Sequence, residues 1–295
     1  MLLDGYRKSI EMALKASIDQ MGEKNRLRDA CEYTLSCGGK RIRPLIVLMI
    51  AEALQQGRNV LPAALSVEFF HTASLIADDL PCMDNDDFRR NRPSLHKEFG
   101  ESIAILSSYT LIAAGYEGIH QNALLMKQDP LWSEKANDAL FLSLEAATRC
   151  AGIQGATNGQ FLDLFPPDNT SETIQKIIYQ KTITLFEIAF IFGWLFGGGD
   201  SHFLKDLKSC AYHLGMAFQI GDDLDDNLQD ASTQNITNVA AVWGKEKAIS
   251  HLKREIALFE DSLKKLGLWT PSFQLLCAFL FEPSKADTIS AVGAF

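Results

Sequence analysis

Apolar side chains recur along almost the whole chain with the 3.6-residue period of an α-helix. In Ser9–Ile18, for example, Ile10, Leu14 and Ile18 share one helical face. Only 9 of 295 residues are proline, and the alternation of apolar and polar residues that marks β-strands is absent. The pattern therefore predicts an all-α fold. The helices we expect are Ser9–Ile18, Arg28–Ser36, Arg43–Gln56, Pro62–Asp79, Ser102–His120, Ser133–Ala151, Gln154–Asp163, Ser171–Phe196, Ser201–Leu228, Asn238–Leu263 and Pro271–Phe281.

The expected helices follow one another without a proline- or serine-rich linker. Gly38–Gly39 and Gly197–Gly199 interrupt them only briefly, and there is no repeat of a fixed short period. Apolar residues make up 47% of the chain, which is ample for one large core. We therefore expect a single domain over residues 1–295.

Composition excludes several classes of function. The net charge is −9, and no basic face suited to nucleic acid is present. Six cysteines are scattered without a CxxC pair, which indicates reduced thiols in a cytoplasmic protein rather than a zinc or redox site. The N-terminal segment reads as an amphipathic helix rather than a signal peptide. Leu185–Gly199 is too short for a membrane span and contains Glu187, so we expect a buried core helix and no membrane span.

A first run of aspartates follows the apolar residues SLIA. Asp78, Asp79 and Asp84 lie within it, at the end of an expected helix, and carboxylate oxygens are ligands that Mg²⁺ prefers. Arg89 and Arg90 follow at once, and arginine binds phosphate bidentately. The run alone leaves two alternatives open. It is either a metal site beside a phosphate clamp or a solvated acidic loop whose charges neutralise one another.

A second run, FQIGDDLDDNLQD, repeats the pattern at the end of another apolar helix. Asp222 and Asp226 stand at i and i+4, a spacing at which like charges destabilise a bare helix. Gln219 lies one turn before Asp223 on the same face. The repetition favours metal binding. If the two acidic helix ends face each other, they suit several Mg²⁺ ions around one diphosphate, which is what ionisation of a carbon–oxygen bond requires.

A basic segment, CGGKRIRPLI, precedes the helix expected from Arg43. Lys40, Arg41 and Arg43 stand beside two glycines just before a helix, which suits a phosphate group, although an ordinary exposed basic turn has the same composition. His71 lies two helical turns before Asp78 and shares its face. A histidine on an apolar helix is more often structural, but this alignment favours a site.

Five motifs stand in an order typical of one family, covering about Gly38 to Asp226. They are GGKRIRP, the DDLPCMD–RR segment, GQFLDL, the Lys181–Thr182 pair and FQIGDDLDD. With these motifs the chain resembles the trans-type isoprenyl diphosphate synthases, the group of farnesyl and geranylgeranyl diphosphate synthases. The resemblance implies an orthogonal helical bundle around a central cavity, usually a homodimer. It also implies a prenyltransferase that condenses an allylic diphosphate (dimethylallyl, geranyl or farnesyl) with isopentenyl diphosphate, head to tail.

The resemblance also implies a role for each motif residue. Three Mg²⁺ ions and the allylic diphosphate would be held by Asp78, Asp79, Asp84, Asp222, Asp223 and Asp226. Arg89 matches the allylic-diphosphate arginine. Isopentenyl diphosphate would be held by Gly39, Lys40, Arg43, His71 and Arg90. Lys181, Thr182 and Gln219 match residues near the allylic diphosphate and the developing cation, with Lys181 and Gln219 as catalytic residues. The implied reaction proceeds by loss of diphosphate, attack by the isopentenyl double bond and loss of a proton.

Two departures from the family pattern keep other functions in view. Ser108–Tyr109 replaces the usual Gly-Asp pair, and we expect Tyr109 to line or narrow the cavity. The loop after Asp230 is short, with Asn235 where the family has a lysine, followed by Thr237. A non-catalytic or modulatory subunit is therefore the main alternative, although both aspartate motifs are intact. A terpene cyclase is less favoured, because cyclases generally lack the GGKRxRP segment.

Small residues before the first aspartate motif bear on product length. In this family the side chains about one turn before that motif set the chain length. Ala73 and Ser74 are small, and Phe69 and Phe70 lie one turn below. A turn of roughly 5.4 Å is comparable to one isoprene unit. We expect geranylgeranyl diphosphate as the product, with farnesyl diphosphate as the shorter possibility. We expect a cytoplasmic protein, or a plastid one if a transit peptide has been removed.

Overall fold

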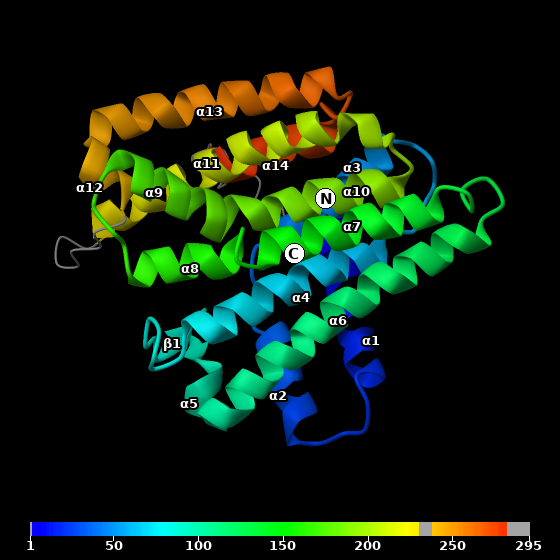
Figure 1. Cartoon of the computed structure of the whole chain (residues 1–295), viewed down its shortest axis with the longest axis horizontal. Coiled ribbons are helices and arrows are strands. Elements are labelled where there is room, and N and C mark those ends of the chain that lie inside the picture. The colour runs from blue at the N-terminus through cyan, green and yellow to red at the C-terminus, as the bar shows by residue number, and fades with distance from the viewer. Residues whose placement is uncertain (1, 230–237, 282–295) are drawn as a thin grey trace, which may run out of the picture. The chain divides into compact units, whose positions relative to one another are not determined.

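The computed structural model describes residues 2–229 and 238–281, and this part of the chain is almost entirely helical (Figure 1). The predicted all-α class is confirmed. The helices are α1 (Leu2–Gln20), α2 (Arg26–Leu35), α3 (Ile42–Ala53), α4 (Leu61–Asp78), α5 (Leu95–Phe99), α6 (Glu101–Gln128), α7 (Ala136–Ala151), α8 (Ala156–Leu164), α9 (Ser171–Ile178), η1 (Tyr179–Ile183), α10 (Thr184–Gly197), η2 (Ser201–Phe203), α11 (Leu204–Gln229), α12 (Val239–Trp243), α13 (Lys245–Lys265) and α14 (Pro271–Phe281).

Three features differ from the expected helix list. The stretch expected as one helix over Ser171–Phe196 contains the π-helical turn η1, and Gly244 with φ +81° separates α12 from α13. The short helix α5 was not expected. Nor was the two-stranded hairpin that precedes it, in which β1 (Phe88–Arg89) pairs with β2 (Arg92–Pro93).

The described chain divides into two compact units. We call Asp4–Ala146 with Phe192–Gly199 the Asp78 unit. We call Ala147–Ile191 with the residues from Asp200 onward the Asp222 unit, which also takes in the start of α1. The chain passes between the units within α1, α7 and α10 and again between Gly199 and Asp200, so the units are covalently connected at each of these points. Each unit contains one of the two aspartate runs.

In the Asp78 unit, α4 and α6 lie side by side (Figure 1). Glycines on α6 allow this approach, because a Cβ atom at Gly115 would lie 2.6 Å from the Phe70 ring. A Cβ atom at Gly118 would lie 2.7 Å from the Pro62 carbonyl oxygen. The buried Asn122 side chain accepts a hydrogen bond from the Ala63 amide at 3.0 Å, which satisfies an otherwise unpaired donor at the helix start. Helix α4 is thereby fixed along its length up to the first aspartates.

In the Asp222 unit, α11 packs along α13. The aromatic core includes Phe190, whose ring centroid lies 6.2 Å from that of Phe259 and 6.4 Å from that of Phe273. By length and composition alone, Ser171–Gly197 would pass as a membrane span, and 78% of its most apolar window is buried. Core helices of soluble proteins pass the same test, so the signal is weak evidence.

Candidate active site

The first aspartate run begins where α4 ends. Asp78 is the last residue of the helix, and Asp79 is buried at its C-cap. The chain then turns back, because the Asp84 amide donates to the Asp78 carbonyl oxygen at 2.9 Å. The Asp84 side chain is exposed. The structure thus places all three predicted carboxylates around one helix end, at decreasing depth from Asp79 to Asp84.

Arg89 is paired with the buried carboxylate. Its Nε donates to Asp79 Oδ1 at 2.9 Å, and its Nη2 also contacts Asp79 and Asp86. Burial raises the pKa of Asp79, although Arg89 opposes the shift. For Arg89, burial acts to lower the pKa, but the Asp79 and Asp86 carboxylates raise it overall. The predicted diphosphate-binding arginine therefore carries a firmly held positive charge.

A tight turn sends two adjacent arginines in different directions. Arg90 and Asn91 connect β1 to β2 with φ of 52° and 61°, the left-handed pair typical of a type I′ hairpin. Arg89 reaches Asp79, whereas Arg90 Nη1 donates to the Gly38 carbonyl oxygen. The hairpin therefore links the first aspartate run to the basic loop within the same unit.

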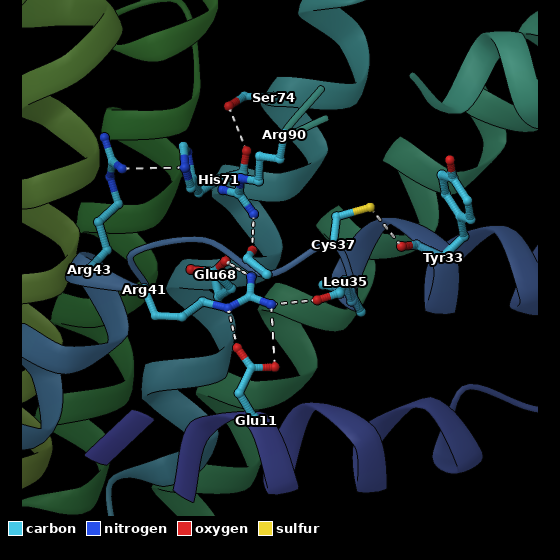
Figure 2. A network of polar contacts seen from close by, with 11 residues as sticks. Glu11, Tyr33, Leu35, Cys37, Arg41, Arg43, Glu68, His71, Ser74 and Arg90 are labelled. Atoms are coloured by element: carbon cyan, nitrogen blue, oxygen red, sulfur yellow. Dashed lines mark hydrogen bonds and ion pairs between the residues drawn. The ribbon is translucent and has the colours of Figure 1, made fainter. Parts of the chain in front are cut away.

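The basic loop is built around Gly39. Gly39 has φ +124°, and a Cβ atom there would lie 2.6 Å from the Arg90 guanidinium carbon. Glycine is therefore required both by the backbone and by the arginine stacked against it. At the start of α3, Arg43 Nη1 lies 3.4 Å from His71 Nε2, as Figure 2 shows. The structure thus gathers Gly39, Arg43, His71 and Arg90 as predicted, with Lys40 exposed beside them.

The pKa of His71 reflects its burial and the positive charges around the basic loop. Burial, followed by the positive charges of Arg43, Arg90, Arg41 and Arg89, lowers the pKa of His71 well below 6.5. Its buried Nδ1 has no hydrogen-bond partner among the described residues. A neutral imidazole surrounded by guanidinium groups indicates a region of positive potential suited to an anion.

Arg41, which the sequence grouped with Lys40 and Arg43 as suited to a phosphate, is instead engaged by two glutamates. Arg41 is buried and forms ion pairs with Glu11 at 2.7 Å and with the buried Glu68. Neither glutamate belongs to a recognised motif, and Glu11 is remote in sequence. Glu68 could have been noticed because it precedes His71 by three positions and shares its helical face, but no sequence pattern identifies Arg41 as the partner of Glu68.

In the Asp222 unit, a chain of hydrogen bonds connects the second aspartate run to the Lys181–Thr182 pair. Thr182 Oγ1 donates to Gln219 Oε1 at 2.9 Å, and Gln219 Nε2 donates to Asp223 Oδ1 at 2.8 Å. Asp223 Oδ2 accepts from the Val239 amide at 2.7 Å. The predicted residues Thr182, Gln219 and Asp223 are therefore joined side chain to side chain. Asp222 lies beside them on α11 and is partly buried.

Lys181 lies on the π-helical turn η1, and such turns often mark functional sites. Its Nζ lies 2.5 Å from Asp163 Oδ2, a partner from the GQFLDL motif to which the sequence gave no role. The approach requires Gly159, because a Cβ atom there would lie 2.2 Å from the Lys181 amide nitrogen. Together, α8 and η1 hold the lysine beside a carboxylate of the same unit.

Some predicted residues lie outside the described part. Asp226 lies on α11, but its side chain is not described, and Asp230, Asn235 and Thr237 fall outside the described residues. In residues 2–229 and 238–281, no three His, Cys, Asp or Glu side chains gather as a metal cage. Mg²⁺ typically keeps waters and binds one or two carboxylates plus substrate phosphates. The aspartate pairs fit that kind of donor set.

Two of the chain-length residues, Ala73 and Phe70, lie on the α4 face that packs against α6. Ala73 is buried, and its carbonyl oxygen accepts from Ser108 Oγ at 3.0 Å. Phe70 packs edge-on against Tyr116, with ring centroids 5.2 Å apart. Phe69 instead lines a groove of about 560 Å³ between α1, α4 and α6. The Ser74 hydroxyl donates to the His71 carbonyl oxygen at 2.9 Å.

Tyr109 and Ser108, which replace the usual Gly-Asp pair, lie on different faces of α6. The Tyr109 side chain is 64% exposed on α6 rather than packed against α4, so its expected place at the cavity wall stays a prediction. Ser108, its neighbour, is the residue that faces α4. One helical position turns a side chain by about 100°, which places these neighbours on different faces.

Comparison with known proteins identifies the family. Residues 24–238 match the family model described as polyprenyl synthetase. The chain is 37% identical over 227 residues to farnesyl diphosphate synthase of Geobacillus stearothermophilus, covering 75% of this chain and 73% of that one. It is 34% identical over 295 residues to chloroplastic geranylgeranyl pyrophosphate synthase 3 of Arabidopsis thaliana, covering 97% and 78%. The solved geranyltransferase of Legionella pneumophila has a TM-score of 0.82 at 29% identity, covering 96% and 97%. The chain belongs to the polyprenyl synthetase family of prenyltransferases.

Proposed function

We propose that this chain elongates an allylic diphosphate by head-to-tail condensation with isopentenyl diphosphate. One observation carries the proposal beyond family membership. Arg89 and Arg90, adjacent in one hairpin, reach the first aspartate run and the basic loop respectively. An elongating enzyme needs two diphosphate sites side by side, and the hairpin supplies a guanidinium group to each. A cyclase, which takes a single diphosphate, has no use for the second.

In this proposal the basic loop holds isopentenyl diphosphate. Its oxygens would be bound by Arg43 and Arg90, with Lys40 from the exposed side and the Gly39 backbone close by. His71, neutral at pH 7, would use the hydrogen-bonding capacity of its ring without adding a further charge. Positive charge held on rigid elements before the substrate arrives costs no reorganisation during the reaction.

The allylic diphosphate is assigned to the two aspartate runs. Asp78, Asp79, Asp84, Asp222, Asp223 and Asp226 would hold Mg²⁺, which we propose as three ions. Bound Mg²⁺ neutralises charge on a departing diphosphate. Arg89 would bind the same diphosphate once it exchanges Asp79 for phosphate oxygens. Lys181 is placed by Asp163 and η1 to contact a phosphate, and the Thr182–Gln219 pair presents oxygen atoms suited to a developing cation.

We propose geranylgeranyl diphosphate as the product, with Phe69 or Phe70 as the floor. Ala73 leaves the level above these rings unfilled by a large side chain. In Ala73→Tyr the added ring would close that level, and we expect the product to shorten to farnesyl diphosphate or less. Chromatography of the dephosphorylated products measures this. An unchanged product would remove Ala73 from the chain-length account.

The assembly and setting are also proposals. We propose that both units form one catalytic domain over residues 1–295 and that the protein is a homodimer. Supporting the dimer, α6 exposes Ile105, Leu106 and Ile112 beside Tyr109, and apolar patches of this kind mark interfaces. The matched relatives include a bacterial and a chloroplastic protein, so we propose the cytoplasm, or the plastid when a leader precedes the chain.

One assay separates the proposal from its alternatives. Purified protein is incubated with Mg²⁺, labelled isopentenyl diphosphate and each allylic starter in turn, and the product lengths are measured. We expect incorporation of label into geranylgeranyl diphosphate. No turnover with any starter would contradict the proposal and favour a modulatory subunit. A cyclic hydrocarbon formed without incorporation of label would instead identify a cyclase.

A further inference from the structure

Arg41 lies within the basic segment, yet it points away from the other basic side chains. Figure 2 shows its guanidinium group enclosed by Glu11, Glu68 and the Leu35 carbonyl. The Arg41 side chain is 1% exposed, and its partner Glu68 is 2% exposed. Burial acts to lower the pKa of Arg41, but Glu68 and Glu11 raise it overall, so the guanidinium group keeps its positive charge. Its charge is therefore balanced internally.

The three partners of Arg41 come from three different elements. Glu11 lies on α1, Leu35 is the last residue of α2, and Glu68 lies on α4. A planar guanidinium group with five donors can bind in several directions at once, which a lysine cannot. Arg41 therefore joins α1, the end of α2 and α4 at a single buried point.

The backbone at Arg41 is held in an unfavourable conformation. Arg41 has φ +50°, and it follows Gly38 at +73° and Gly39 at +124°. A left-handed conformation is unfavourable for a residue other than glycine, and such conformations persist only when surrounding contacts hold them in place. The buried contacts of Arg41 supply that constraint. Without them, the loop would lose the turn that separates Arg41 from Arg43.

Two side-chain contacts join the start of α3 to α4. Arg41 meets Glu68, and Arg43 meets His71 at 3.4 Å. Glu68 and His71 are three residues apart and lie on one face of α4. The Arg41–Glu68 contact is a buried ion pair, whereas the other contact places Arg43 beside the neutral ring of His71. The hydrogen-bonded partner of the Glu68 carboxylate is thus the buried Arg41, whereas Arg43 lies beside a neutral ring.

We propose that Arg41 is a positioning residue for isopentenyl diphosphate. It fixes the Gly38–Gly39 loop, so that the Gly38 carbonyl oxygen receives Arg90 and the start of α3 aims Arg43 at His71. Arg41 itself does not touch the substrate. The inference rests on the proposed function, because it assigns isopentenyl diphosphate to this loop.

Arg41→Lys tests the proposal, because it keeps the charge and removes the fork. We expect the KM for isopentenyl diphosphate to rise about tenfold, the cost of roughly one charged hydrogen bond. The KM for the allylic substrate and kcat should stay within about twofold. Glu11→Gln, at the more exposed partner, should raise the same KM by about threefold. It also keeps the test usable if Arg41→Lys fails to fold.

Arg58→Lys is the matched control. Arg58 is also buried, pairs with Asp129 at 3.2 Å and donates to the Phe196 carbonyl oxygen at 3.0 Å, but it lies outside the basic loop. We expect a lower Tm and a KM for isopentenyl diphosphate within about twofold of the wild type.

Calorimetric titration with isopentenyl diphosphate alone separates failure of this inference from failure of the proposed function. If the wild type neither binds nor consumes isopentenyl diphosphate, both are overturned. If the wild type binds it and Arg41→Lys and Glu11→Gln bind it with unchanged Kd, only the inference is overturned. An equal rise in both KM values, matched by Arg58→Lys, would also overturn it, since that pattern reflects general loosening.

Discussion

The two aspartate runs carry the same Asp-Asp pair in very different surroundings. In the Asp78 unit, Asp79 is held by the guanidinium group of Arg89. In the Asp222 unit, Asp223 is held by the Gln219 amide and the Val239 backbone amide, which carry no net charge. Metal or diphosphate that arrives at Asp79 must therefore compete with Arg89, whereas two neutral donors help to orient Asp223. Identical motifs in sequence therefore do not imply identical contacts.

The largest expected effect comes from removing the charge of either pair. Asp79→Asn and Asp223→Asn should each lower kcat by about 1000-fold, because metal-mediated charge stabilisation is worth several kcal/mol. Initial rates with labelled isopentenyl diphosphate measure this loss. Asp168→Asn, an exposed aspartate bonded to Thr170, should retain wild-type rates. Full activity of either cluster variant would mean that only one run serves the reaction.

The next effect compares the cations beside each run. Arg89→Gln removes the partner of Asp79, and Lys181→Gln removes that of Asp163. We expect the KM for the allylic diphosphate to rise about 10- to 100-fold in the first and about tenfold in the second, since the arginine fork makes two charge-assisted bonds. Steady-state kinetics with isopentenyl diphosphate saturating would check both. A rise confined to the KM for isopentenyl diphosphate would contradict this role, because it would show that Arg89 binds isopentenyl diphosphate instead of the allylic diphosphate.

Alanine in place of a glycine should lower the free energy of unfolding by different amounts in the two units. Gly159→Ala places a Cβ atom 2.2 Å from a backbone nitrogen, so we expect the free energy of unfolding to fall by about 1–3 kcal/mol. Gly39→Ala meets the movable Arg90 side chain and a strained φ, with an expected loss of about 1–2 kcal/mol. Urea unfolding gives both values. Equal stability of Gly159→Ala and the wild type would contradict the close contact of α8 with η1.

The smallest effect is a pH dependence confined to the Asp78 unit. The folded-state pKa of His71 is below the unfolded value, so the unfolded state binds more protons. The contribution of His71 to the free energy of unfolding is therefore fully present above pH 6.5. It falls as the pH drops below that value, by at most about 1.4 kcal/mol per pH unit. His71→Gln should remove that part of the slope between pH 7.5 and 5.5. An unchanged slope would show that His71 is not the group responsible.

The sequence predicted the helices well because their apolar period is a local property. It predicted the site residues because they stand in motifs, and the structure joins Thr182, Gln219 and Asp223 directly. It did not predict the hairpin, because Arg90 and Asn91 adopt left-handed conformations without a glycine to signal the turn. Nor did it predict the Arg41–Glu11 pair, whose partners come from distant elements. Contacts between residues that are remote in sequence produce no periodic pattern from which they could be predicted.

Metal dependence of turnover tests the central claim most directly. Metal is removed from the wild-type protein with EDTA. The protein is then assayed, with and without added Mg²⁺, for addition of labelled isopentenyl diphosphate to the starter farnesyl diphosphate. The account predicts no incorporation without metal, and full recovery of geranylgeranyl diphosphate synthesis when Mg²⁺ is restored. Incorporation that persists in the stripped protein, or none at any Mg²⁺ concentration, would contradict it.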